Sequence, residues 1–427
     1  RIDQDLPYDD SPMGDEGLAN ADFNGPARNG LIGLGGSAGA RFGNGRGANR
    51  ATNGGGGGGE GLRAAVEDAL RWLAAHQSPN GGWEAAGFNR WCDLKPVAQG
   101  PDGLGKALYD PGVTGLATLA FLGAGYTHRG RHPFAKTVSR ALRYLRNVQD
   151  AEGCFGPRTS QHYIYNHACA ALAMVEAYGM TESPVLKGSA QGGLDFIALS
   201  RNPYFAWRYG VRPGDNDTSV TGWMMMALKS AKLINTSAIA RGKAPLLAID
   251  EEAFDGIRAW IDKMTDPDSG RVGYLQRGSA PARPEAMVDR FPTDRTESMT
   301  AVGVLARVFI GEDPRRSEAV KKGAAVCRKV LPTWDPDQGT IDMYYWYYGT
   351  LAMFQVGGAT WKDWNAAMKT AIADTQRRDT DFCMYKGSWD PIGPWGDDGG
   401  RVYSTALMAM CLQVYYRYDR VFVGAGR

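Results

Sequence analysis

A glutamine followed at fixed spacing by a glycine and an aromatic residue occurs twice in this chain. The two copies are Gln77-Ser78-Pro79-Asn80-Gly81-Gly82-Trp83 and Gln149-Asp150-Ala151-Glu152-Gly153-Cys154-Phe155, and both read Q-x-x-x-G-x-(W/F). Internal repeats of this kind are typical of architectures that stack copies of one supersecondary unit. We expect the glutamine to end a helix, the glycine to supply the positive φ of a tight turn, and the aromatic ring to cover the helix end.

Composition excludes several kinds of partner. The 427 residues carry a net charge of only +2, so no nucleic-acid or polyanion partner is expected. No apolar run approaches the roughly 20 residues of a membrane helix, and the histidines are too scattered to indicate a metal or a cofactor. The chain begins at Arg1, which favours a processed product whose targeting segment has been removed.

The six cysteines are widely spaced, and none forms a C-x-x-C pair. Most of them fall in apolar helical context. We expect mostly buried free thiols, with disulfides as the alternative.

Residues 1–60 differ in kind from the rest of the chain. They are rich in Gly, Asn and Ala and end in six consecutive glycines before Glu60. Such a composition buries too little apolar surface to offset the entropy of ordering the chain. Two interpretations stay open: a flexible linker to an N-terminal anchor, or an arm that docks on its own body, on a neighbouring subunit or on another protein.

From residue 61 onward two series of predicted helices alternate. The first is amphipathic and covers residues 62–73, 134–145, 194–199, 254–264, 320–331 and 361–372. The second is apolar or small on nearly all sides and covers residues 113–126, 163–178, 218–233, 296–310, 343–356 and 402–418. Six outer and inner pairs that close on themselves predict an all-α (α/α)6 toroid over residues 61–427. An open solenoid is the alternative.

Three segments carry a resemblance to a known family: DTSVTGW at 217–223, YYWYYGTLAMF at 344–354 and GRVYSTAL at 400–407. With the repeats, they resemble the prenyltransferase/squalene-oxidase repeat superfamily, which includes squalene cyclases, other terpenoid cyclases and protein prenyltransferase β subunits. Uncharacterised bacterial members, planctomycete ones in particular, look most alike. The resemblance implies an extracytoplasmic domain, periplasmic or at the cell surface, and a hydrophobic or isoprenoid ligand. It implies no reaction, because a fold does not fix a function.

The resemblance allows the cyclase chemistry to be tested. Class II terpene cyclases protonate an alkene or epoxide with the aspartates of a D-x-D-D motif. Aligned on Asp217-Thr218, this chain has Asn216 at the central position, and an amide cannot donate a proton to carbon. Asp215 stands one residue away. Asp217 is expected to cap a helix.

The zinc site of the protein prenyltransferases is also incomplete. The family binds zinc with Asp, Cys and His at the starts of the fifth and sixth inner helices. Asp342 matches the aspartate, but Tyr344 and Tyr403 stand where the thiolate and the imidazole would be. No zinc is expected. If the chain is an enzyme, Asp215, Asp217 and Asp342 are the candidate catalytic residues.

Other toroids of this class are glycosidases and polysaccharide lyases, which use paired carboxylates. Acids near inner-helix starts would meet at one mouth, beside aromatic residues and an arginine. The candidate ligand-binding residues are Asp110, His167, Trp223, Glu297, Tyr344, Trp346, Arg401 and Tyr403. Helix capping is the alternative for the acids, and a hydrogen-bonded place in the core is the alternative for His167.

The first functional hypothesis is a non-catalytic extracytoplasmic binding or assembly module. The second is a terpenoid cyclase-like enzyme acting on a polyprenyl substrate, with a carbohydrate-active hydrolase or lyase as a further alternative. The lumen discriminates between them. A deep aromatic pocket with an unpaired buried carboxylate would favour an enzyme, and a lumen filled by side chains would favour assembly.

Overall fold

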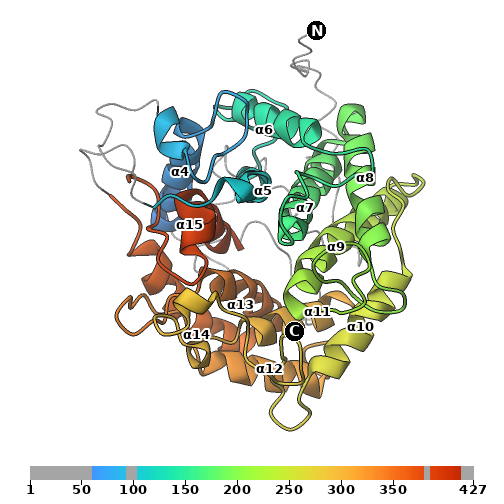
Figure 1. Cartoon of the computed structure of the whole chain (residues 1–427), viewed down its shortest axis with the longest axis vertical. Helices are drawn as coiled ribbons and strands as arrows, with labels where there is room; N and C mark the ends of the chain where they lie inside the picture. Colours follow the sequence, from blue (N-terminus) through green and yellow to red (C-terminus); the bar gives the residue numbers. More distant parts are fainter. Residues whose placement is uncertain (1–59, 93–102, 379–384, 415–427) are drawn as a thin grey trace.

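The computed structural model describes residues 60–92, 103–378 and 385–414. These residues form twelve α-helices arranged as a ring around a central opening (Figure 1). The predicted arm, residues 1–60, lies outside the described residues except for Glu60, where helix α4 begins.

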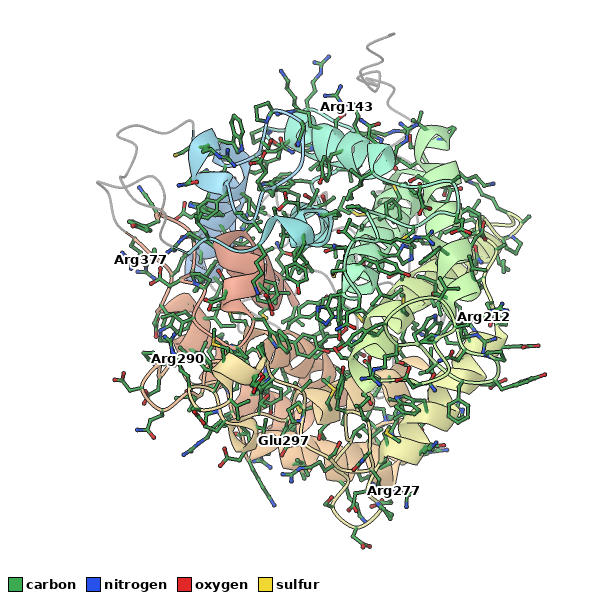
Figure 2. All side chains as sticks on the ribbon, viewed as in Figure 1. Arg143, Arg212, Arg277, Arg290, Glu297 and Arg377 are labelled. Carbon is green, nitrogen blue, oxygen red and sulfur yellow. The ribbon has the colours of Figure 1, made fainter. Side chains whose placement is uncertain are left out.

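Six helices form the outside of the ring. They are α4 (Glu60–Ala75), α6 (Ala135–Asn147), α8 (Pro184–Ser200), α10 (Glu252–Met264), α12 (Glu318–Arg328) and α14 (Gly358–Met368), which continues as a π-helical turn (Lys369–Ala373). Their polar faces meet solvent, and long side chains such as Arg143 on α6 lie at the edge of the ring (Figure 2). Helix α8 is much longer than the predicted 194–199. Gly188, Gly192 and Gly193 interrupt its apolar periodicity.

The other six helices form the inside of the ring. They are α5 (Asp110–Gly123), α7 (Tyr163–Thr181), α9 (Thr218–Ala240), α11 (Ser298–Phe309), α13 (Met343–Val356) and α15 (Gly396–Leu412). Each contacts the next, and α15 returns to contact both α4 and α5. The ring is therefore closed. The predicted all-α (α/α)6 toroid is confirmed and the open solenoid is excluded.

Small residues set how closely the inner helices approach. At Gly115 on α5, an added Cβ atom would lie 2.7 Å from the backbone carbonyl carbon of Cys169 on α7. Real side chains do not tolerate such a contact, so only glycine permits this packing. Helix α15 begins earlier than predicted and bends at Gly400, where φ is 65°. Residues 415–418 of the last predicted inner helix lie outside the described residues.

The repeated glutamine connects neighbouring units. The Gln77 Nε2 atom donates to the carbonyl oxygen of Gly81 at 2.8 Å and to that of Thr137 on the next outer helix at 2.9 Å. Gln149 repeats this contact with Gly153 and with Ser189 on α8, each at 3.0 Å. Both glycines have the predicted positive φ, 96° at Gly81 and 92° at Gly153. The turn prediction is confirmed, and the glutamine also joins one helical pair to the next.

A third copy of this contact closes the ring. Gln376 Nε2 donates to the carbonyl oxygen of Gly387 at 2.9 Å and to that of Ala65 on α4 at 2.7 Å. Trp389 Nε1 donates to the Ile372 carbonyl oxygen at 2.7 Å, as Trp83 Nε1 donates to that of Leu73 at 2.8 Å. The sequence pattern does not predict this copy, because a longer segment separates its glutamine from its glycine.

Four cysteines are buried free thiols, as expected: Cys154, Cys169, Cys327 and Cys411. Cys92 differs, because it is disulfide-bonded. Within the described residues, no helix combines the length and the apolar character that crossing a membrane requires. No cluster of three or more His, Cys, Asp and Glu side chains is placed to hold a metal ion in this part of the chain.

Candidate ligand chamber

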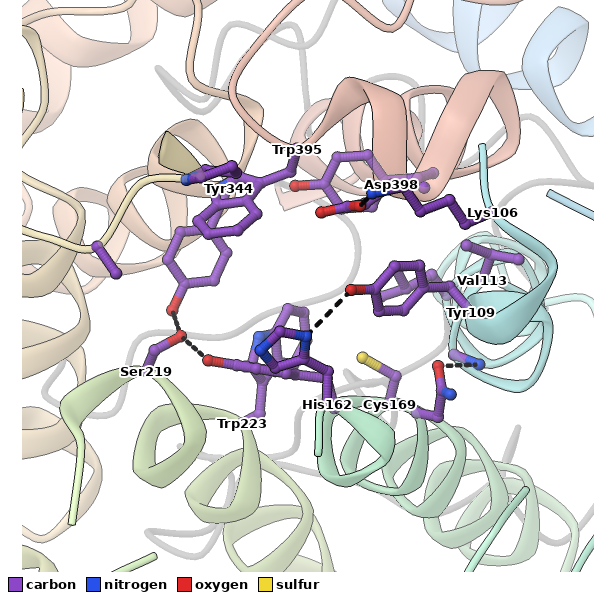
Figure 3. A pocket seen from close by; sticks show the side chains of 18 of the residues that line it. Lys106, Tyr109, Val113, His162, Cys169, Ser219, Trp223, Tyr344, Trp395 and Asp398 are labelled. Atoms are coloured by element: carbon purple, nitrogen blue, oxygen red, sulfur yellow. Dashed lines mark hydrogen bonds and ion pairs between the residues drawn. The ribbon is translucent and has the colours of Figure 1, made fainter. Parts of the chain in front are cut away.

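The inner helices enclose a cavity of about 500 Å³ near their N-terminal ends (Figure 3). Every inner helix contributes to its wall. The contributions include Val113 from α5, Cys169 from α7, Trp223 from α9, Met299 from α11, Tyr344 from α13 and Tyr403 from α15. Side chains therefore do not fill the lumen at this end. We call this cavity the chamber.

The chamber wall is mostly apolar and rich in aromatic rings. Trp223 is 3% exposed and stacks on Tyr347, with ring centroids 5.5 Å apart. Several further rings come from the connecting loops: Tyr109, His162, Tyr209, Tyr274 and Trp395. A volume of about 500 Å³ lies within the roughly 300–1,000 Å³ range of small-molecule sites. The chamber suits a ligand that is mainly apolar.

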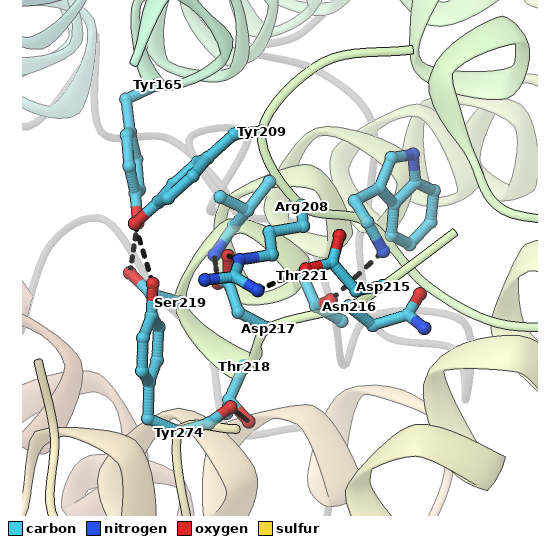
Figure 4. Close-up of polar contacts among 12 residues, drawn as sticks. Tyr165, Arg208, Tyr209, Asp215, Asn216, Asp217, Thr218, Ser219, Thr221 and Tyr274 are labelled. Carbon is cyan, nitrogen blue, oxygen red and sulfur yellow. Dashed lines mark hydrogen bonds and ion pairs between the residues drawn. The ribbon is translucent and has the colours of Figure 1, made fainter. Parts of the chain in front are cut away.

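Hydroxyl groups of wall residues form hydrogen bonds with one another, and Figure 4 shows those of Tyr165 with Ser219 and of Tyr209 with Tyr274. Tyr165 donates to Ser219 Oγ at 3.1 Å, and Ser219 Oγ lies 2.9 Å from the Tyr344 hydroxyl. The Tyr209 and Tyr274 hydroxyls lie 2.6 Å apart. Burial raises the pKa of Tyr165 and of Tyr344, so both phenols stay neutral near pH 7. These hydroxyl groups offer neutral hydrogen bonds and no phenolate charge.

The wall also carries a few ionisable groups. Lys106 Nζ lies 2.6 Å from Asp398 Oδ1, which ties the loop before α5 to α15. The Tyr109 hydroxyl lies 3.4 Å from His162 Nδ1. Burial lowers the pKa of His162 below its usual value, so its ring is neutral near pH 7.

The candidate cyclase acids lie outside the chamber wall. Asp215 is 57% exposed and is ion-paired with Arg208. The Asn216 Oδ1 atom accepts from the Asn202 side chain and from the Ala206 N–H, both at 3.0 Å. Neither side chain is placed to protonate a ligand in the chamber.

Asp217 is fully buried at the start of α9 and does not line the chamber. Its Oδ1 atom accepts from the Val220 N–H at 2.7 Å, so it caps α9 as expected. Among the described residues, no group donates a hydrogen bond to its Oδ2 atom, and Arg208 Nε lies 3.9 Å away. Burial raises the pKa of Asp217 to about 7. This carboxyl is consequently a weaker acid than an ordinary aspartic acid.

Asp342 is buried and fully partnered. Its Oδ1 atom accepts from the Tyr345 N–H at 3.0 Å and caps α13. Its Oδ2 atom accepts from Arg283 Nη2 at 2.7 Å and from Thr296 Oγ1 at 2.9 Å. The carboxylate therefore holds a helix start and a buried arginine together.

Three of the eight candidate ligand-binding residues line the chamber: Trp223, Tyr344 and Tyr403. Two others are acids placed elsewhere. Asp110 accepts from the Ala85 N–H at 2.8 Å, and burial raises its pKa to about 7. Glu297 lies outward of the central opening (Figure 2) and accepts from Thr300 Oγ1 at 2.9 Å.

The remaining three candidates are buried in the protein away from the chamber. His167 accepts from the Phe155 N–H at 3.2 Å, and burial lowers its pKa to about 3, so it is a neutral core histidine. Trp346 packs against Trp334. Arg401 pairs with Asp390 at 2.8 Å.

Several wall residues were not among the candidates. Tyr165 lies near the start of an inner helix, and this position in the repeat indicates a place in the chamber wall. Tyr209, Tyr274 and Trp395 come from irregular loops, whose residues follow no periodic pattern. Only the folded ring brings these loops to the chamber.

Comparison with known sequences points to the terpene-processing toroids. Residues 58–269 match the family described as the squalene-hopene cyclase C-terminal domain. A squalene–hopene cyclase of Bradyrhizobium diazoefficiens is 26% identical over 260 residues, a match that covers 57% of this chain and 37% of that enzyme. A dammaradiene synthase of Dryopteris crassirhizoma is 28% identical over 136 residues, covering 29% of this chain and 19% of that enzyme. The chain thus spans well under half the length of these relatives.

Solved structures share the fold. The type II terpene cyclase MstE from Scytonema, in complex with geranylgeranyl dihydroxybenzoate, aligns with a TM-score of 0.50 and 13% identity over 83% of this chain and 97% of that one. An α-1,6-mannanase of Salegentibacter aligns with a TM-score of 0.53 and 12% identity over 83% and 99%. At such identities the likeness concerns the fold alone. The closed ring and the sequence matches support the resemblance of this chain to the squalene cyclase-like superfamily.

Proposed function

We propose that this chain binds an isoprenoid or similarly apolar ligand in the chamber and does not cyclise it by protonating an alkene. The observation that carries the proposal is an open aromatic chamber with the candidate acids outside its wall. The ligand class is supported by the relatives, which are cyclases of isoprenoids, and by MstE, which holds a geranylgeranyl compound.

Apolar burial supplies the affinity in this proposal. Each methylene group removed from water contributes about 0.8 kcal/mol. A long hydrocarbon chain therefore gains substantial binding free energy from an apolar wall. The rings of Trp223, Tyr344 and Tyr403 offer large, rigid faces for such a chain.

The positions of the acids argue against alkene protonation. An alkene is a very weak base, so its proton donor must be a strong acid in contact with it. Asp217 is weakened by burial and does not line the chamber. Of the described residues that do, only Asp398 carries a carboxylate, and it is paired with Lys106. A glycosidase or lyase with two carboxylates at one site is disfavoured for the same reason.

A cyclase-like enzyme that depends on Asp217 is the second candidate. One observation favours it: Asp217 is buried, and its Oδ2 atom has no hydrogen-bond donor among the described residues. Unsatisfied buried polar atoms are uncommon, and some of them have catalytic roles.

One experiment separates the two candidates. The purified chain is incubated with squalene and with geranylgeranyl compounds, and the lipids are extracted and identified by mass spectrometry. Binding without catalysis returns the ligand unchanged, and the bound ligand raises the Tm of the protein. A cyclised product that disappears in Asp217→Asn would instead establish the enzyme.

We also propose an extracytoplasmic location. The disulfide at Cys92 supports it, because disulfides persist mainly in oxidising compartments. Fractionation of native cells, with thiol labelling before and after reduction, tests this. A reduced Cys92 in the cytoplasmic fraction would contradict it.

Self-association or binding of a protein partner through residues 1–60 is a separate proposal. Light scattering of the full chain and of a chain lacking residues 1–59 tests the self-association. The proposal of self-association is contradicted if the full chain and the shortened chain both scatter light as monomers.

A further inference from the structure

The α11 side of the chamber holds a buried hydroxyl without a partner. Ser298 is the first residue of α11, lines the chamber and is 1% exposed. Its Oγ atom makes no hydrogen bond within the described residues. The indole Nε1 of Trp395, another wall residue, is likewise buried without an acceptor in this part of the chain. Leaving such groups unsatisfied is costly, which makes a ligand acceptor favourable here.

The start of α11 is also uncapped. Helices α9 and α13 are capped by Asp217 and Asp342. At α11 the N-cap residue is Glu297, and within the described residues its side chain accepts no hydrogen bond from a first-turn N–H group. The Glu297 carboxylate instead pairs with Arg271 and accepts from Thr300 Oγ1 at 2.9 Å. The first-turn N–H groups and the positive end of this helix dipole thus lack a cap from the N-cap side chain.

The charges around this position are paired, including the Glu297 carboxylate directly before Ser298, which is balanced by Arg271. Arg283 lines the chamber and donates to Asp342 on the adjoining helix start at 2.7 Å. Asp342 in turn accepts from Thr296, two residues before Ser298. The one carboxylate among the described wall residues, Asp398, is balanced by Lys106.

We propose that the ligand of the chamber ends in an anionic oxygen head group, a carboxylate or a phosphate ester, bound at the start of α11 with Ser298 as donor. The inference rests on the proposed function and narrows its ligand class. The hydroxyl of Ser298 and the first-turn N–H groups donate to the head group, and the apolar tail fills the aromatic part of the chamber. A pure hydrocarbon leaves these donors unsatisfied.

Four ligands with the same geranylgeranyl chain test this: the carboxylic acid, the monophosphate, the alcohol and a hydrocarbon of equal length. Their Kd values are measured by quenching of tryptophan fluorescence. We expect at least one anionic ligand to bind about 10-fold or more tightly than the hydrocarbon, with the alcohol between them. Comparing the acid with the monophosphate then decides which head group the chain prefers.

Two substitutions locate the head group. Ser298→Ala removes the hydroxyl and should reduce the preference for the anion to about threefold. Ser298→Asp places a carboxylate at the helix start, and it should abolish the preference through repulsion of the anion. The matched control is Ser160→Ala, because Ser160 also lines the chamber but its Oγ already accepts from the His162 N–H at 3.2 Å. This control should keep the full preference.

The outcomes distinguish the two proposals. If none of the four ligands binds, the proposed function fails and this inference fails with it. If hydrocarbon and anion bind equally, or if Ser160→Ala weakens anion binding as much as Ser298→Ala, the head-group site is wrong while the apolar chamber stands.

Discussion

Asp217 combines a structural role with an unusual titration. It caps α9 by accepting from the Val220 N–H. Burial raises its pKa to about 7, whereas the pKa of an aspartate in an unfolded chain is about 3.9. The folded chain therefore holds this proton more tightly than the unfolded chain. The resulting stabilisation is full below about pH 4 and is lost as the pH rises through about 7.

Replacing Asp217 with asparagine should remove this pH dependence. The amide oxygen can still accept from the Val220 N–H, so the cap is retained, but the side chain no longer ionises. Relative to the unmodified chain, Asp217→Asn should gain about 1–4 kcal/mol of unfolding free energy between pH 4.5 and pH 8, since one pKa unit corresponds to about 1.4 kcal/mol. Urea denaturation at the two pH values measures it. A difference that does not change with pH would mean that Asp217 is already charged in the folded chain at low pH.

Two buried tryptophans provide a matched test of the chamber. Trp223 lines it, and Trp346 is equally buried but does not. Trp223→Phe and Trp346→Phe should each cost about 1–3 kcal/mol of stability, because each leaves unfilled volume. Only Trp223→Phe should also weaken ligand binding, by about three- to tenfold. Equal effects on the Kd would argue that the ligand lies elsewhere.

At the scale of helices and their starts, the Asp342–Arg283 pair joins a loop to α13. Both side chains are nearly inaccessible, at 3% and 2% exposed. Asp342→Asn keeps the helix cap but leaves the guanidinium buried without its counter-charge. We expect a loss of about 3–5 kcal/mol, the usual cost of breaking a buried ion pair. Asp215→Asn, at an exposed pair, should cost under about 1 kcal/mol. Thermal unfolding of both variants checks this, and similar losses would contradict the argument.

The helices were predictable from the sequence, and much of the chamber was not. Amphipathic and all-apolar periods persist over whole helices, so the alternating pairs could be read directly, as α6 and α7 show. Trp223, Tyr344 and Tyr403 lie on such helices, and the sequence predicts them as ligand-binding residues. Tyr209, Tyr274 and Trp395 lie on loops, and Ser298 is distinguished only by a missing partner, which depends on three-dimensional contacts.

At the scale of the whole molecule, glutamine side chains link one helical pair to the next. Gln149 ties the turn after α6 to α8, and Gln376 ties the turn after α14 to α4. Both make two hydrogen bonds to backbone carbonyl groups. They differ in position, since the Gln149 contact joins units that are consecutive in the chain and the Gln376 contact joins its last and first parts. The chain therefore keeps the two partners of the Gln149 contact close together, whereas the partners of the Gln376 contact are far apart in the sequence.

This difference predicts where the ring opens. Gln149→Ala and Gln376→Ala should each cost about 1–3 kcal/mol, because buried carbonyl groups lose their donors. Hydrogen exchange should speed up mainly in α8 for the first variant and in α4 for the second. The second effect should be larger, because the chain does not directly connect α4 to the unit that holds Gln376. Exchange followed by mass spectrometry resolves the two helices. An equal, ring-wide increase in both variants would show that the toroid unfolds only as one unit.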